Sequence, residues 1–175
     1  MCKVVEANQY YNLDMEKSNL QIKEELLRIT HCLNSANLDY ALCGGLAVAV
    51  HGYPRATKDI DLLVSADQLD RVREVLASIE YDLESGEIPF DKGSHKERRI
   101  FRVSRAVGHE LFTLDLILVT PVFADVWETR EDIELESQRI HVVSIEGLIK
   151  MKQLASRPQD LADIDALSKL SPPKL

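Results

Sequence analysis

The sequence predicts an α/β (α+β) domain in which helices flank a mixed β-sheet, with one helix before the sheet and a helical pair after it. One observation is the helical spacing of apolar residues near the N-terminus, among lysines and glutamates. A second is a series of short apolar segments, each the length of a strand. A third is Pro158, which divides the last helical region into two.

The N-terminal third is expected to contain an arm, two helices and a strand. Residues 1–14 show no clear period, and we expect an irregular arm there. Apolar residues at helical spacing over 16–36 predict an amphipathic helix that buries Leu20, Ile22, Leu26, Ile29 and Leu33. Residues 40–43 predict a short buried strand. The segment 45–51 is apolar nearly all round and predicts a buried helix that ends before Pro54.

The middle of the chain is expected to add three strands and one helix. Ser65–Gln68 has the form of a capping box, which opens a helix that runs to about residue 78. Strands are predicted where apolar residues dominate or alternate, at 60–64, 99–104 and 111–119. The segment 82–97 predicts a loop because it contains Gly86, Pro89 and Gly93.

The C-terminal part is expected to begin with one more strand, over 133–143. Ser144 is expected to cap a helix, Pro158 to start the last helix, and Ser-Pro-Pro at 171–173 to end the fold. The length of 175 residues suits one domain with a substantial core. We expect three parts: an N-terminal arm and helix over residues 1–37, a catalytic core over 38–144, and a C-terminal helical pair over 145–175 packed on the core.

The composition narrows the function classes. A formal net charge of −8 argues against a protein that grips long duplex nucleic acid, because such proteins carry a positive surface. No apolar run approaches the ~20 residues of a membrane span, and the first residues lack the apolar core of a signal peptide. Cys2, Cys32 and Cys43 show no metal-ligand spacing. We therefore expect a cytoplasmic protein that has no membrane partner.

Two aspartates at the start of one predicted strand suggest a metal site. Because side chains alternate across a strand, Asp59 and Asp61 point to the same face, and their Cα atoms lie roughly 6–7 Å apart. Asp115 has the same alternation in its own strand, opposite an aliphatic run. A lone buried aspartate would face water at a strand edge or pair with an arginine. Three carboxylates in this pattern favour a divalent metal instead.

A double glycine precedes the aspartates at the junction of a predicted strand and helix. Gly44 and Gly45 allow the backbone to approach a ligand closely, and the following helix offers free N–H groups to a phosphate. Taken alone, this junction is also compatible with simple tight packing. Together with the carboxylates it predicts a site for metal and phosphate.

These motifs resemble the nucleotidyltransferase fold of the DNA polymerase beta superfamily. The resemblance rests on Gly-Gly, on Arg55-x-Thr57-x-Asp59-x-Asp61 and on the distant Asp115, and it covers roughly residues 38–165. The nearest likeness is to minimal bacterial members, including the nucleotidyltransferase toxins of toxin–antitoxin systems. The C-terminal segment looks like a helical motif of that group: Lys152, Arg157, Asp160 and Asp163.

The resemblance implies Mg²⁺ (or Mn²⁺) and a nucleoside triphosphate substrate. It assigns Asp59, Asp61 and Asp115 as catalytic residues that bind the metals, with Asp115 helping to activate the acceptor hydroxyl. The remaining residues that it assigns to the triphosphate are Gly44, Gly45, Arg55, Thr57 and Lys152. Arg55 could equally balance the carboxylates, and Asp160 and Asp163 either belong to the functional motif or form a structural network. Many members have serine where this chain has Gly45, which is a departure from the family pattern.

The resemblance therefore implies an enzyme that moves a nucleoside monophosphate from a nucleoside triphosphate to a hydroxyl. The acceptor is left open among an RNA 3′ end, a protein and a small molecule, and an antitoxin partner or a homodimer is compatible with the likeness. Two alternatives share the fold: a catalytically silent nucleotide-binding or interaction module, and an antibiotic-modifying nucleotidyltransferase.

Overall fold

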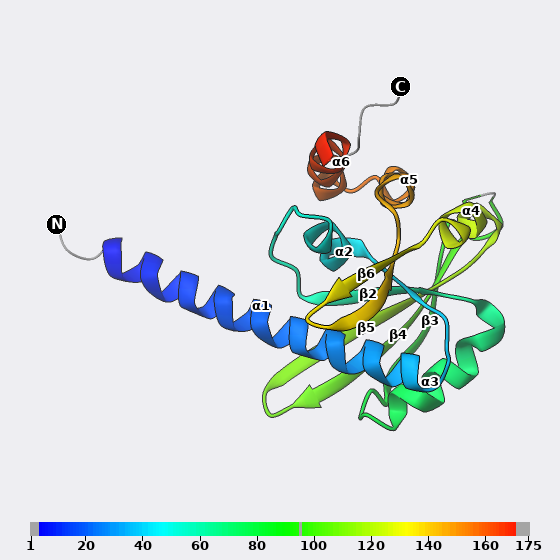
Figure 1. Cartoon of the computed structure of the whole chain (residues 1–175), viewed down its shortest axis with the longest axis horizontal. Helices are drawn as coiled ribbons and strands as arrows, with labels where there is room; N and C mark the ends of the chain where they lie inside the picture. The colour runs from blue at the N-terminus through cyan, green and yellow to red at the C-terminus, as the bar shows by residue number, and fades with distance from the viewer. Residues whose placement is uncertain (1–3, 95, 171–175) are drawn as a thin grey trace.

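The computed structural model describes residues 4–94 and 96–170. Its centre is a mixed seven-stranded sheet with the order β3-β4-β5-β2-β1-β7-β6 (Figure 1). The strands are β1 (Ala41–Cys43), β2 (Asp59–Val64), β3 (Leu83–Phe90), β4 (Arg98–Val107), β5 (Glu110–Leu118), β6 (Glu131–Leu135) and β7 (Gln138–Val142). β2 runs parallel to β5 and β1 runs parallel to β7, whereas every other neighbouring pair is antiparallel. The predicted mixed sheet is confirmed.

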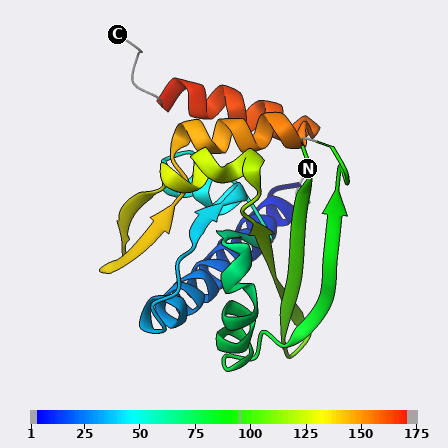
Figure 2. The ribbon, with the colours of Figure 1, turned by 90° about the vertical axis from the view of Figure 1, so that its right-hand side faces the viewer.

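Six α-helices and two short 3₁₀ turns surround the sheet. The helices are α1 (Val4–Ser35), α2 (Gly44–Val50), α3 (Leu69–Ala77), α4 (Ala124–Glu128), α5 (Ile145–Ala155) and α6 (Pro158–Leu170), and the turns are η1 (Ala66–Gln68) and η2 (Pro121–Phe123). α1 contacts α3, β2 and β7, whereas α5 contacts α2, α4 and α6. Figure 2 shows α5 and α6 side by side across one end of the sheet, as a C-terminal helical pair. No helix among the described residues has the length and apolar character needed to cross a membrane.

The apolar faces predicted from periodicity form the core. The α1 residues Ile22, Leu26, Ile29 and Leu33 are buried, and only Leu20 departs from the prediction, since it is exposed. On β2 the alternation leaves Ile60 and Leu62 fully buried, on the face opposite the two aspartates. Ser144 caps α5 as predicted, because its hydroxyl accepts a hydrogen bond from the Gly147 N–H.

The N-terminal part and the start of α3 differ from the sequence predictions. The irregular arm predicted over 1–14 is wrong for residues 4–14, since α1 already begins at Val4, and residues 1–3 lie outside the described part of the chain. The capping box at Ser65–Gln68 is also wrong. The Ser65 hydroxyl donates to the Asp67 carboxylate, and the first turn is the 3₁₀ turn η1. A short serine side chain bonds readily to a neighbouring aspartate, which competes with capping. The predicted end at Ser-Pro-Pro, 171–173, lies outside the described residues.

The predicted loop over 82–97 is wrong for its first half, which forms β3. This strand is at the edge of the sheet and pairs only with β4. An edge strand tolerates proline because one side of its backbone needs no partner, and Gly86 lies at a bulge with a φ of +79°. The loop signals therefore marked irregularities inside an edge strand.

The single strand predicted over 133–143 is a hairpin, β6 and β7, joined by a two-residue turn. Glu136 and Ser137 both have positive φ, of 49° and 66°. Such turns usually contain asparagine or glycine, so no turn could be recognised from these two residues. η2 and α4, for which no prediction was made, connect β5 to this hairpin.

Candidate active site

Three carboxylates lie together on β2 and β5. These strands are parallel and in register, with Asp61 opposite Asp115 and Asp59 opposite Thr113. Neighbouring strands lie about 4.8 Å apart, so the Asp61 and Asp115 side chains leave the sheet next to each other. Asp59 emerges two residues away on the same face. The predicted arrangement on one face is therefore confirmed.

The surroundings of Asp61 disfavour the charged form of its carboxyl group. Its partial burial, together with the neighbouring charges of Asp115 and Asp59, raises its pKa to about 7 from the ordinary 3.8. Asp59, at the start of β2, is exposed. The cluster thus has an excess of negative charge that a cation would relieve.

Arg102 on β4 forms an ion pair with Asp115 that the sequence analysis did not identify. The antiparallel register places Arg102 directly opposite Asp115. Its Nε donates to Oδ1 at 2.7 Å and its Nη2 donates to Oδ2 at 2.8 Å, a bidentate geometry. These bonds raise the pKa of the guanidinium. The short connection between the predicted strands 99–104 and 111–119 was the available signal, because strands joined in this way usually pair with each other.

The three carboxylates are suitable ligands for a divalent cation, although both carboxylate oxygens of Asp115 accept hydrogen bonds from Arg102. Within 4–94 and 96–170, no three histidine, cysteine, aspartate or glutamate side chains already converge as metal ligands. Carboxylate oxygens are the ligands that Mg²⁺ and Mn²⁺ prefer. Burial and the charges of Asp115 and Asp59 raise the pKa of Asp61 more than the positive charges of Arg157 and Lys152 lower it, so a bound cation would favour its charged form. The chemistry of the site therefore fits the metal that the resemblance implies.

The double glycine lies against the carboxylates and the loop before β2. Gly44 has a φ of +64°, and a Cβ placed on it would come 1.9 Å from Oδ2 of Asp61. A Cβ on Gly45 would come 2.8 Å from Nη2 of Arg55 and 2.9 Å from Oγ1 of Thr57. A side chain at either position would need its neighbours to move. The Arg55 guanidinium and the Thr57 hydroxyl therefore fill the space where the family's serine side chain would begin.

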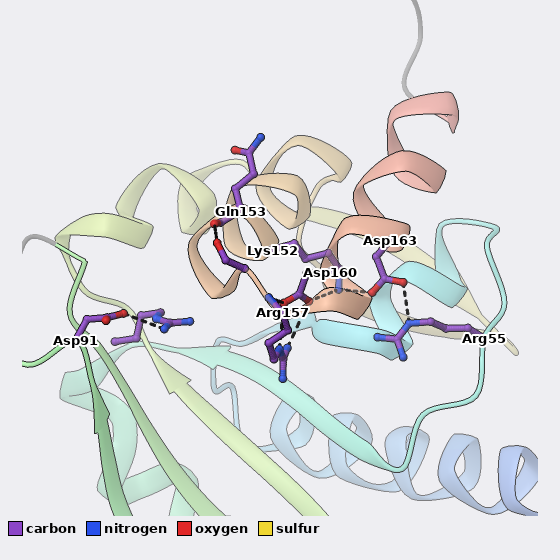
Figure 3. A network of polar contacts seen from close by, with 9 residues as sticks. Arg55, Asp91, Lys152, Gln153, Arg157, Asp160 and Asp163 are labelled. Atoms are coloured by element: carbon purple, nitrogen blue, oxygen red, sulfur yellow. Dashed lines mark hydrogen bonds and ion pairs between the residues drawn. The ribbon is translucent and has the colours of Figure 1, made fainter.

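Lys152 belongs to a chain of buried ion pairs under α5 and α6 (Figure 3). Its ammonium group lies 2.5 Å from Oδ2 of Asp163 and 3.5 Å from Oδ1 of Asp160. Its side chain is 5% exposed, and those of the two aspartates are 1–2% exposed. The structural network that the sequence analysis left open for Asp160 and Asp163 is therefore present. The assignment of Lys152 to the triphosphate stays a prediction.

Two arginines extend this chain of ion pairs toward the carboxylates. Nε of Arg55 lies 3.0 Å from Oδ1 of Asp163, and Nε of Arg157 donates to Oδ2 of Asp160 at 3.0 Å. Burial opposes ionisation of Asp160, but the hydrogen bonds from Arg157 outweigh it and lower its pKa. Arg55 therefore ties the Gly45 region to α6 through Asp163, and its predicted contact with a phosphate stays a prediction.

A cavity of about 260 Å³ opens beside Asp61 and Asp115. Gly44 and Lys152 also line it, so the double glycine, the carboxylates and α5 share one space. Much of the remaining wall is apolar, from β3, β4, β5, η2 and α5: Phe90, Ile100, Ile117, Phe123, Leu148, Met151 and Ala155. The sequence analysis did not predict this apolar extension, because its residues are distant in the chain.

Comparisons with known proteins agree with this geometry. A Thermotoga maritima protein described as a candidate nucleotidyltransferase has 15% sequence identity, with 86% of this chain and 94% of that chain covered and a TM-score of 0.58. ANT(2″)-Ia, solved in complex with adenylyl-2″-tobramycin, has 14% identity, coverage of 87% and 90%, and a TM-score of 0.56. No curated protein matches the sequence. At these identities the structural likeness establishes the fold.

The family to which the chain belongs is shown by its sequence. The profile of a family described as uncharacterised nucleotidyltransferases matches residues 3–171, which is nearly the whole chain. With the in-register carboxylates and the nucleotidyltransferase-like fold, this match identifies the chain as a member of that nucleotidyltransferase family.

Proposed function

We propose that this nucleotidyltransferase uses Mg²⁺ or Mn²⁺ to move a nucleoside monophosphate from a nucleoside triphosphate to a hydroxyl group. The observation that carries the proposal is the register of β2 and β5, which sets Asp61 beside Asp115 and Asp59 on the same face. In the reaction a bond forms between the acceptor oxygen and the α-phosphorus. The bond from the α-phosphorus to the bridging oxygen breaks, and pyrophosphate leaves.

Asp59, Asp61 and Asp115 would hold the metal. A bound divalent cation would offset the phosphate charge and lower the pKa of the acceptor hydroxyl. Asp115 is the carboxylate that would accept the hydroxyl proton. For this role it must share or release Arg102, whose guanidinium is 39% exposed and so has room to turn toward solvent or a phosphate oxygen.

Gly44, Gly45, Arg55 and Thr57 would hold the β- and γ-phosphates. The close contacts of an added Cβ at both glycines support a role for the bare backbone here, because a side chain at either position would need its neighbours to move. Thr57 would supply the hydroxyl that a serine at position 45 supplies in many members. Arg55 would add a positive charge while its Nε stays with Asp163.

Calorimetric titration with ATP, CTP, GTP and UTP, each with and without MgCl₂, tests the proposal. We expect binding of at least one nucleotide that depends on the metal and is lost in Asp61→Asn. The matched control is Asp165→Asn, because Asp165 is an exposed aspartate on α6 that pairs only with Lys169 among the described residues. Failure to bind any of the four nucleotides would overturn the proposal in favour of a silent module.

The acceptor is proposed to be an RNA end or a protein hydroxyl in the cytoplasm, as the resemblance to toxin-type members suggests. A reducing compartment suits the free thiols of Cys32 and Cys43. Incubation of the enzyme with α-labelled nucleotides and a cell lysate, followed by separation of RNA from protein, identifies the acceptor class. Label in neither fraction would count against this acceptor class and favour a small molecule.

A further inference from the structure

We propose that the apolar cavity beside the carboxylates holds the nucleobase of the donor nucleotide and that Arg98 recognises the base by donating a hydrogen bond to it. The inference rests on the proposed function and names the part of the nucleotide that this wall recognises. The phosphate-binding residues lie at one side of Asp61. Gly44 lines the cavity together with Asp61 and Asp115, and the cavity also reaches β3 and β4, which hold none of the phosphate-binding residues.

The walls of the cavity suit a flat apolar group. Ile100 and Ile117 are directly paired on β4 and β5 and share the face that bears Arg102 and Asp115. Leu148, Met151 and Ala155 of α5 line the cavity as well, so an occupant would lie between sheet and helix. The volume of about 260 Å³ is below the ~300–1,000 Å³ of sites for drug-sized ligands. It therefore suits a base better than a large polar acceptor.

Arg98 lies on β4 at the end of this wall that is farther from the carboxylates. It follows the alternation of Ile100 and Arg102 along β4, so its Cα lies roughly 13–14 Å from that of Arg102. That separation accommodates a ribose and a base beyond an α-phosphate at the carboxylates. Arg98 also lines the cavity.

The Arg98 side chain is held in place but has one donor unused. Its Nη2 donates to Asp91 at 2.9 Å, and its guanidinium lies 5.5 Å from the centre of the Phe90 ring. Its Nε is buried and has no hydrogen-bond partner within the described residues. A buried donor without a partner is unfavourable, because it has lost its hydrogen bonds to water. A ring nitrogen or carbonyl of a nucleobase would satisfy it, since arginine only donates.

The test compares binding of the four nucleoside triphosphates with binding of inorganic tripolyphosphate, all with MgCl₂, by calorimetry. Tripolyphosphate reports the phosphate site alone. We expect the wild-type protein to bind at least one nucleotide tenfold more tightly than tripolyphosphate. Arg98→Met keeps the apolar stem and removes the donor. It should weaken nucleotide binding about tenfold, narrow the spread among the four bases, and leave tripolyphosphate binding unchanged.

Arg99→Met is the matched control, because Arg99 points to the opposite face of β4 and pairs with Glu87. Its affinities should equal those of the wild type. A second variant, Ala155→Phe, adds bulk to the α5 wall. It should weaken nucleotide binding and spare tripolyphosphate, and thermal unfolding confirms that each variant is folded.

The outcomes separate this inference from the proposed function. If tripolyphosphate binds but nucleotides bind no more tightly, the inference is overturned and the phosphate site stands. The inference is also overturned, and the phosphate site stands, if nucleotides bind more tightly than tripolyphosphate but Arg98→Met and Ala155→Phe bind them with wild-type affinity. That result is expected when the cavity binds the acceptor. If neither tripolyphosphate nor any nucleotide binds, both the inference and the proposed function are overturned.

Discussion

Two groups of charged residues lie next to each other and differ in balance. The cluster on the sheet has three carboxylates, Asp59, Asp61 and Asp115, and among the described residues only one cation, Arg102, forms an ion pair with them. The network under α5 and α6 has two carboxylates and three cations: Asp160, Asp163, Lys152, Arg55 and Arg157. The first group is partly open to the cavity, whereas the central pairs of the second are almost fully buried.

The difference supports the proposal that the first group binds a ligand and that the second group is structural. Buried charges persist when each is paired, and removing one partner leaves an uncompensated charge. The network meets this condition by itself. The cluster does not, since Asp61 has a pKa raised to about 7 by burial and by its carboxylate neighbours. An excess charge of this kind is typical of a functional site.

The largest expected effect is on catalysis by the cluster. Asp115→Asn should lower label transfer at least about 100-fold, because a metal ligand and the proton acceptor are both lost. The stability should change by no more than about 1 kcal/mol, since Arg102 is 39% exposed. Single-turnover labelling and urea unfolding measure the two quantities. A large loss of stability with normal transfer would place Asp115 among the structural pairs.

The next largest effect is expected on the stability of the folded protein, through the network of buried ion pairs. Lys152→Met should lower the free energy of unfolding by about 3–5 kcal/mol, because Asp163 and Asp160 lose a buried cation. Transfer by the folded protein should remain. Lys150→Met is the control, since Lys150 forms an exposed pair with Asp125 worth about 0–1 kcal/mol. Normal stability with a sharp fall in transfer rate would instead support Lys152 as a triphosphate ligand.

A smaller effect tests whether Arg102 occupies the metal's place. Arg102→Met should raise the affinity for Mn²⁺, measured without nucleotide by electron paramagnetic resonance, by about tenfold. Both Asp115 oxygens become available, and a repelling positive charge is removed. The exposed Arg139 on β7 provides the control, Arg139→Met. Weaker Mn²⁺ binding in Arg102→Met would show that the arginine supports the metal site.

The smallest effect concerns pH and Asp61 in metal-free protein. Its folded pKa, about 7, is above the ordinary value of 3.8, so its neutral form is favoured by folding. Its contribution to stability is fully present below about pH 4 and is lost as the pH rises through 7. Asp61→Asn should therefore be more stable than the wild type at pH 8 and should match its stability at pH 4. Urea unfolding in EDTA at both pH values measures the difference, and equal stability at pH 8 would contradict the prediction.

Local patterns determined much of the fold and of the candidate site. Strict alternation set Asp59 and Asp61 on one face of β2, and the same rule aligned Asp115 on β5, because side-chain direction in a strand depends only on adjacent residues. The apolar spacing of α1 was equally readable, as burial of Ile22 and Leu26 shows. Side chains pack closely against Gly44 and Gly45, whereas the predicted approach of this backbone to a phosphate stays a prediction.

Errors arose where local signals have more than one structural meaning. Gly86 and Pro89 mark a loop in most contexts, yet in β3 they are accommodated by a bulge and a free strand edge. Glu136 and Ser137 carry no turn signal, yet they form the turn between β6 and β7. In both cases pairing with the neighbouring strand outweighs the local preference.

Tertiary structure alone decided which distant residues meet. The register of β4 and β5 brings Arg102 to Asp115, and packing of α6 brings Asp163 to Arg55 and Lys152. Residues of β3, β4, β5 and α5 line the cavity, so it forms only when these elements pack together. Arg98, whose Nε is buried, also lines it. The sequence by itself determined the carboxylates and their common face, since these follow from neighbouring residues. Their counter-ions and the shape of the surrounding wall depend on strand register and helix packing, which no local pattern encodes.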